Sequence, residues 1–297
     1  MTRELVVISG KGGVGKTTIS ASLAYYLYSN NINFIAADAD VDTPSLKLLL
    51  PIEKIIDRNE IKISKKALID YSKCNKCHEC IKYCNYGAII LDEKGYPKII
   101  NYMCEGCGVC KLVCPNNAIS LIETKTGELI KAITKYGFPL VTAQLEVGEH
   151  NSGLLVGAVK NEAGKVAEKK NAEYILIDGA PGIGCPVIAA LLGASYALII
   201  IEPTPQSLQG AIRVKGVADH FKVPVGAIIN KYDISNYTEK VKEILKINNI
   251  NLIGEVPLDY EVLKAVANRM PILEYNTNSK ASKALLNSFK ILMEEIL

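Results

Sequence analysis

The chain has 297 residues, of which 49% are hydrophobic and 22% charged, and its formal net charge is +3. This composition excludes an intrinsically disordered chain, and 22 glycines and 12 prolines without a period exclude collagen-like and low-complexity sequences. The apolar run at residues 5–8 is too short for a secretory signal. Prolines and glycines interrupt the uncharged stretch 179–201, so we expect a cytoplasmic protein without a membrane span.

The first predicted strand, residues 5–8, runs into a glycine-rich loop and then into a helix with Ile19, Leu23 and Leu27 on one face. This order is the context of a P-loop, and Gly10 to Thr17 fits the pattern G-x-x-x-x-G-K-[ST]. We expect Lys16 to reach the β- and γ-phosphates and Thr17 to ligate magnesium. The residues predicted to hold the nucleotide here are Gly12, Gly13, Val14, Gly15, Lys16, Thr17 and Thr18.

A second lysine, Lys11, stands early in this loop. The run Lys-Gly-Gly-Val-Gly-Lys-Thr-Thr resembles the deviant Walker A motif of the MinD, ParA and Mrp ATPases and of the nitrogenase iron protein. The resemblance covers essentially the whole chain. It implies an ATPase that forms a homodimer through its nucleotide face, with Lys11 reaching the partner's phosphates as an arginine finger does elsewhere. A plain surface lysine is the alternative.

Three acidic residues, Asp38, Asp40 and Asp42, follow a second predicted strand, residues 34–37. Carboxylates at this edge of a parallel sheet can hold magnesium waters and orient an attacking water. The resemblance places switch I here. We assign Asp40 and Asp42 to catalysis, with Lys11 and Lys16, and Asp38 to magnesium; one of the three acids could instead cap the next helix.

Eight of the nine cysteines form two quartets of the pattern C-x2-C-x2-C-x3-C. Three closely spaced thiolates can wrap one cubane, and the displaced fourth then serves the other cluster, as in bacterial two-cluster ferredoxins. Zinc is the alternative, but its usual spacing is two separated C-x2-C pairs. The sequence thus predicts two 4Fe-4S clusters. One is held by Cys74, Cys77, Cys80 and Cys114, and the other by Cys104, Cys107, Cys110 and Cys84.

These clusters would lie in a small inserted domain, residues 61–122, with short strands near residues 67–69, 88–91 and 119–122. Thiolates and oxidised cores together would bring the net charge to about −1. The basic pI therefore gives no reason to expect nucleic acid, and the lysines and arginines are scattered.

The stretch 144–153 resembles one in MinD-like ATPases that carry an inserted ferredoxin domain. Two interpretations remain open: it lines the dimer face, or it is a strand-to-helix turn capped by Asn151 or Ser152. Asp178 ends a third buried strand, residues 174–177, and resembles the Walker B aspartate, which reaches magnesium through water. Cys185, at the end of switch II, is either a small packed thiol or one half of a pair across the dimer axis.

The run Asn230-Lys231-Tyr232-Asp233 matches the guanine-reading motif of GTPases, yet the early lysine and the resemblance favour ATP. We place Asn230, Pro257 and Asp259 around the base. The C-terminal helix carries Leu285, Phe289, Leu292 and Ile296 on one stripe and is expected to dock on the domain's own sheet; a MinD-like membrane anchor is the alternative.

Buried strands that alternate with helices predict an α/β fold, a doubly wound parallel sheet formed by residues 1–60 and 123–297, with the α+β ferredoxin-like insert between them. The leading hypothesis is an ATP-hydrolysing protein whose dimer closure gates electron transfer from the clusters to a partner protein. The alternative is a carrier of iron-sulfur clusters or metallocofactors of the Mrp type. A spatial-positioning switch would leave eight cluster ligands unexplained.

Overall fold

The computed structural model describes residues 2–296 and divides into two compact units. The first comprises Met1–Arg58, Leu129–Gln144 and Gly153–Leu297, and the second Asn59–Glu128 and Leu145–Ser152. The predicted insert, residues 61–122, falls inside the second unit. That unit is larger than predicted because its strands begin earlier and end later, and because it includes the segment 145–152.

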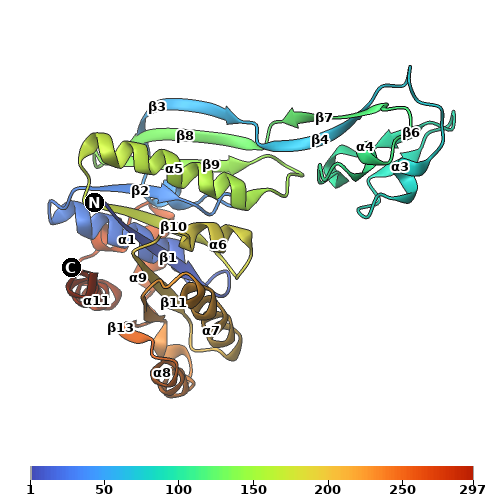
Figure 1. Ribbon diagram of the computed structural model, residues 1–297. Coiled ribbons are helices and arrows are strands. Elements are labelled where there is room, and N and C mark those ends of the chain that lie inside the picture. Colours follow the sequence, from blue (N-terminus) through green and yellow to red (C-terminus); the bar gives the residue numbers. More distant parts are fainter. Residues whose placement is uncertain (1, 297) are drawn as a thin grey trace. The chain divides into compact units, whose positions relative to one another are not determined.

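A nine-stranded sheet forms the centre of the first unit, in the order β13-β12-β11-β1-β10-β2-β9-β8-β3 (Figure 1). Six neighbouring pairs, from β13 to β9, are parallel. The turn 135–138 is too short for a crossover, so β8 and β9 form an antiparallel hairpin. The strands are β1 (Arg3–Ser9), β2 (Phe34–Asp38), β3 (Ile52–Ile61), β8 (Gly127–Thr134), β9 (Pro139–Leu145), β10 (Tyr174–Pro181), β11 (Tyr196–Ile201), β12 (Val225–Asn230) and β13 (Asn251–Val256).

Helices accompany this sheet, and several begin at recognisable signals. Thr204 accepts a hydrogen bond from the Ser207 N–H and is followed by Pro205, which together start α7. The helices are α1 (Lys16–Ser29), α2 (Leu46–Leu49), α5 (Ser152–Lys170), α6 (Cys185–Leu191), α7 (Pro205–His220), α8 (Thr238–Ile247), α9 (Tyr260–Ala267), α10 (Ile272–Tyr275) and α11 (Lys280–Ile296), with the 3-10 turn η2 (Tyr232–Ile234). The prediction of an α/β fold is thereby confirmed as a sheet that is mostly parallel.

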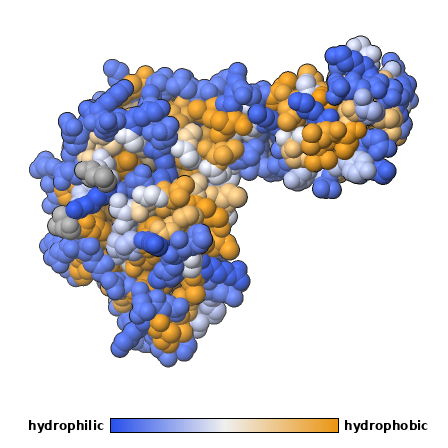
Figure 2. Space-filling model, viewed as in Figure 1, coloured by the Kyte–Doolittle hydropathy of each residue, from blue (hydrophilic) through white to orange (hydrophobic). Residues whose placement is uncertain are grey.

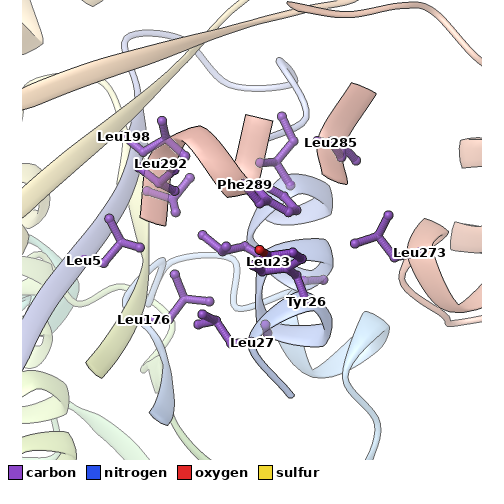
Figure 3. Packing of buried hydrophobic residues seen from close by; sticks show 14 of the residues in the cluster. Leu5, Leu23, Tyr26, Leu27, Leu176, Leu198, Leu273, Leu285, Phe289 and Leu292 are labelled. Atoms are coloured by element: carbon purple, nitrogen blue, oxygen red, sulfur yellow. The ribbon is translucent and has the colours of Figure 1, made fainter. Parts of the chain in front are cut away.

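The main core lies between the sheet and the helices α1 and α11. Leu285, Phe289 and Leu292 of α11 face Leu23, Tyr26 and Leu27 of α1, beside strand residues Leu5, Leu176 and Leu198 (Figure 3). The predicted stripe of the C-terminal helix is therefore packed against its own domain. Between residues 2 and 296 no helix is both long and apolar enough to cross a membrane.

The second unit is built on two short antiparallel pairs, β4 with β7 and β5 with β6. Its elements are β4 (Ser64–Ile69), α3 (Glu79–Lys82), β5 (Ile89–Leu91), β6 (Pro97–Ile99), the turn η1 (Asn101–Met103), α4 (Val109–Leu112) and β7 (Ile119–Thr124). The three strands predicted here are present. Its small core consists largely of cysteine side chains with Ala67, Ile69, Ala88, Ile89 and Ile119.

Leu292 and Ile291 provide a matched test of the packing of α11. Leu292 is fully buried, whereas its neighbour Ile291 is 39% exposed. We expect Leu292→Ala to lower the free energy of unfolding by about 2–5 kcal/mol, because it leaves a cavity against α1. Ile291→Ala should cost clearly less. Denaturant unfolding followed by circular dichroism checks both variants, and equal losses would contradict this packing.

Candidate functional site

The glycine-rich loop connects the end of β1 at Ser9 to the start of α1 at Lys16. Gly13 and Gly15 have φ values of 81° and 92°, which favour glycine. A Cβ at Gly15 would also lie 2.4 Å from the side-chain nitrogen of Asn230. The loop therefore brings backbone N–H groups to the N-terminus of a fourteen-residue helix, the arrangement that binds phosphate.

A cavity of about 380 Å³ lies over this loop. It is lined by Ser9, Gly12, Gly13, Gly15, Lys16, Thr17, Thr18, Asp40, Thr43, Ser45 and Pro181. Most of the predicted phosphate-binding residues thus line one hollow, although Val14 is buried beneath it. Both strands that end here, β1 and β10, are neighbours in the sheet, so their carboxyl ends meet at this edge.

Asp178 is the centre of the polar contacts beneath the cavity. Its Oδ1 accepts hydrogen bonds from Lys16 Nζ and Ser20 Oγ, each at 2.8 Å, and its Oδ2 accepts one from Thr17 Oγ1 at 2.7 Å. The carboxylate is fully buried. Asp40 Oδ2 lies 3.7 Å from the same ammonium. The ammonium of Lys16 and the hydroxyl of Thr17 thus lie together at the phosphate loop. In P-loop proteins these two groups bind the β- and γ-phosphates and magnesium.

Burial and crowding shift the acids of this site. Burial, with the nearby Asp178, raises the pKa of Asp38 to about 8. Burial also raises the pKa of Asp40. For Lys16, burial lowers the pKa, but the contact with Asp178 outweighs it and the net shift is upward, so this lysine stays charged.

Two of the three predicted acids, Asp38 and Asp42, do not line the cavity, and the roles assigned to them stay predictions. Asp38 accepts backbone N–H bonds from Asp40 at 3.3 Å and from Leu46 at 2.9 Å, so it fixes the loop after β2 rather than facing the cavity. Asp42 is exposed and does not line the cavity. Of the three, only Asp40 lies beside Lys16. Lys11 is exposed at the tip of the loop.

The residues predicted to surround the base lie in different parts of the structure. Asn230 is buried, and its side chain donates to the Val14 carbonyl at 2.8 Å, which places it directly behind the phosphate loop. Asp259 instead caps α9, accepting from the Glu261 N–H, and also accepts from the Ala281 N–H. Pro257 does not line the cavity. Base contacts by Pro257 and Asp259 remain a prediction.

Four hydroxyl residues of the site escaped the sequence analysis. Ser20 donates to Asp178, and Ser9, Thr43 and Ser45 line the cavity. The signal for Ser20 was available, since it lies four positions after Lys16 on a helix and therefore on the same face. Thr43 and Ser45 follow Asp40 in an irregular loop, where no periodicity marks them.

The cysteines of the second unit surround two small cavities. One is lined by Cys74, Cys77, Cys80 and Cys114. The other is lined by Cys84, Cys104, Cys107 and Cys110. Each cavity thus combines three cysteines of one quartet with the fourth of the other. Cys77 and Cys107 are exposed, while Cys80, Cys104 and Cys110 are buried.

Burial disfavours the thiolate form of the two cysteines Cys80 and Cys110. Burial, reinforced by the neighbouring thiols Cys110 and Cys77, raises the pKa of Cys80 to about 11, and burial also raises the pKa of Cys110. Metal coordination deprotonates such a thiol. Within residues 2–296 no three cysteine, histidine or acidic side chains converge on a single ion position. In a cubane each cysteine binds a separate iron, so its ligands surround a volume; the clusters stay a prediction.

Cys185 is exposed rather than packed inside the domain. It begins α6, and a Cβ at Gly153 near the start of α5 would lie 2.8 Å from its Cβ. The segment 145–152 connects β9 to α5, as one interpretation predicted. Just before that helix, the side-chain nitrogen of Asn151 donates to Ser64 Oγ at 2.9 Å.

Comparisons with known proteins agree with this fold. The family model described as the CobQ/CobB/MinD/ParA nucleotide binding domain matches residues 5–272. An uncharacterised protein of Methanocaldococcus jannaschii is 34% identical over 294 residues, covering 99% of this chain and 97% of its own length. The septum site-determining protein MinD of Helicobacter pylori is 25% identical over 309 residues, covering 100% and 92%. The solved structure of MinD from Pyrococcus horikoshii, complexed with Mg-ADP, superposes with a TM-score of 0.59 at 18% identity, covering 98% and 96%.

The raised pKa of Asp38 predicts how stability depends on pH. Between the ordinary aspartate value of 3.8 and about 8, the folded chain keeps this proton while the unfolded chain releases it. Stability of the nucleotide-free protein should therefore fall as pH rises through this window, by up to about 1.4 kcal/mol per pH unit from this group. Asp38→Asn should flatten the profile, and Asp42→Asn should not. Urea unfolding at several pH values measures both; unchanged slopes in Asp38→Asn would contradict the assignment.

Proposed function

The chain belongs to the CobQ/CobB/MinD/ParA nucleotide-binding family, and on that premise we propose that it binds and hydrolyses ATP with magnesium and carries two 4Fe-4S clusters. ATP-dependent closure of a homodimer would gate electron transfer from these clusters to a partner protein. One observation carries the proposal: two cavities, each lined by four cysteines, occur in the same chain as a phosphate-loop cavity.

ATP and magnesium are supported by the contacts at the loop. Lys16, Thr17 and Ser20 converge on Asp178 at 2.7–2.8 Å, directly under the loop amides. A phosphate chain offers Lys16 an anionic partner, and magnesium offers Thr17 and Asp178 a common cation. The related MinD of Pyrococcus horikoshii was crystallised with Mg-ADP. Asp233 already accepts the Leu258 N–H at 2.7 Å, which fits guanine reading less well than adenine binding.

The clusters are supported by the crosswise grouping of the cysteines. A zinc ion in either cavity would need its ligands drawn to one point, and among the described residues no three such side chains converge in that way. The eight cysteines line two separate cavities of a small core. Exposure of Cys77 and Cys107 brings one corner of each predicted cluster to the surface, where electrons can pass to a partner. Figure 2 shows apolar residues on the face of this unit turned to the viewer, and Tyr102 and Leu112 are among its exposed apolar side chains.

Coupling between nucleotide and clusters rests on chain continuity. Between the acids of the predicted switch I and the predicted insert lie α2 and β3. Strands β3, β8 and β9 are all members of the nine-stranded sheet, and residues 59–61 of β3, 127–128 of β8 and 145 of β9 belong to the second unit. Three strands are therefore continuous between the two units, and we propose these as the route by which nucleotide binding affects the clusters.

A cluster carrier of the Mrp type is supported less well. The resemblance implies a C-x-x-C pair in the ATPase domain of such carriers, and Cys185 is the only cysteine outside residues 74–114. All other cysteines line the two four-cysteine cavities. This arrangement suits clusters that stay in the protein better than clusters that are transferred to an acceptor.

The cluster proposal is tested by anaerobic purification followed by iron and sulfide analysis and EPR of the reduced protein with ATP or ADP. We expect about eight irons and eight sulfides per chain, because each cubane holds four of each. We also expect the midpoint potentials to differ between the two nucleotides. Zinc without sulfide would refute the clusters. Two cubanes whose midpoint potentials are the same with ATP and with ADP would refute only the gating.

Lys11→Ala tests the dimer. Because Lys11 is exposed at the loop tip while Lys16 is buried on Asp178, the variant should still bind ATP. We expect it to lose ATP-dependent dimerisation and to hydrolyse ATP about 10³-fold more slowly, as on removal of an arginine finger. Sedimentation and phosphate release measure these effects. Lys246→Ala, an exposed lysine of α8, is the control and should behave as the unchanged protein. Normal dimerisation of Lys11→Ala would overturn its role in trans.

A further inference from the structure

A buried lysine contacts the main chain of one predicted cluster ligand. Lys66, on β4, is 6% exposed, and its Nζ donates to the Cys104 carbonyl at 2.9 Å. The next residue, Ala67, directs its N–H to Cys104 Sγ at 3.5 Å and lines the same cavity. Gly106 of the same loop packs directly against β4, because a Cβ there would lie 2.0 Å from the Lys65 carbonyl oxygen. The ligand loop is therefore seated on β4 beside a buried positive charge.

The partner of this lysine comes from a distant part of the chain. Glu149 Oε1 lies 3.0 Å from Lys66 Nζ, and the two side chains are only 9% and 7% exposed. Glu149 belongs to the segment 145–152, which is also held to the second unit by Asn151 on Ser64 and by His150, whose Nε2 lies 3.3 Å from the Tyr102 carbonyl. The other carboxylate oxygen of Glu149 is buried without a hydrogen-bond partner in residues 2–296.

At the cavity lined by Cys74, Cys77, Cys80 and Cys114, the neighbouring lysines form no equivalent arrangement. Lys73, Lys76 and Lys82 are exposed. They pair with Asp70, the Lys94 carbonyl and Glu79, respectively, instead of with a cysteine. Each cavity is therefore lined by four thiols, but the electrostatic surroundings of the two cavities differ.

We propose that the Lys66–Glu149 pair tunes the reduction potential of the cluster held by Cys84, Cys104, Cys107 and Cys110, and so sets it apart from the other cluster. The inference rests on the proposed function, because it assumes that cubanes occupy these hollows. Hydrogen bonds and nearby charge are among the levers that set cluster potentials. Lys66 and Glu149 act through Cys104 and are positioning residues.

The two partners must act with opposite signs. Reduction adds one negative charge to a cluster, so a nearby ammonium stabilises the reduced form and a nearby carboxylate opposes it. Lys66→Met leaves the carboxylate alone and should lower the midpoint potential of one cubane. Glu149→Gln leaves the ammonium alone and should raise it. A role limited to packing would not produce opposite shifts.

The experiment is an anaerobic redox titration of the reconstituted full chain, followed by EPR. For each single variant we expect about a tenfold change in the ratio of reduced to oxidised cluster at fixed potential, which equals 59 mV for one electron. The change should affect one of the two cubanes. Because an unpaired buried charge can prevent folding, the double variant Lys66→Met with Glu149→Gln is included and should return close to the unchanged protein.

A matched control comes from a solvent-exposed pair of the same unit, Lys125 and Glu146, whose charged atoms lie 2.9 Å apart. Lys125→Met and Glu146→Gln remove the same charges where water screens them and should leave both potentials in place. Equal potentials in all variants, or shifts of one sign in both single variants, would overturn the tuning while leaving the clusters intact. Absence of sulfide from the unchanged protein would overturn the proposed function itself.

Discussion

The nucleotide site depends on the hydrogen bonds that the buried carboxylate of Asp178 accepts. This carboxylate has no exposed surface, and its cost of burial is offset by the ammonium of Lys16 and the hydroxyls of Thr17 and Ser20. These three donors all lie on the first turns of α1, so one carboxylate fixes the orientation of that helix against β10. The loop that lines the cavity leads directly into this helix. Binding geometry and the packing of α1 are therefore parts of the same arrangement.

The second unit is organised by a different constraint. Its core is made largely of cysteines with a few small aliphatic residues, which is too little apolar surface to hold so small a fold by itself. A metal centre that binds four thiolates in each hollow would supply the missing stability, as it does in other small metal-binding domains. The segment 145–152 adds a buried ion pair and two polar contacts to the same unit. Because this segment lies between β9 and α5, a stretch of chain outside the predicted insert belongs to the cysteine-rich unit.

Several acids show how one residue type serves different purposes in one fold. Asp40 lies beside Lys16, Asp38 fixes the loop that carries Asp40, and Asp259 caps a helix. Asp38 ends β2, and Asp40 and Asp259 follow shortly after a strand; at such positions an aspartate accepts backbone N–H groups as readily as it binds a cation. Their different burial, and not their position in a motif, separates these roles. Lys66 and Glu149 extend this point, since neither belongs to a recognisable motif.

Local patterns in the sequence were sufficient for the P-loop and for the buried strands, because each depends on residues close together in the chain. The edge strand β3 was missed, since most of its residues are exposed and it has no apolar pattern. Tertiary structure alone placed Glu149 on Lys66 and distinguished Asp40 from Asp42. These outcomes depend on contacts between residues far apart in sequence and on burial, and no spacing rule encodes either.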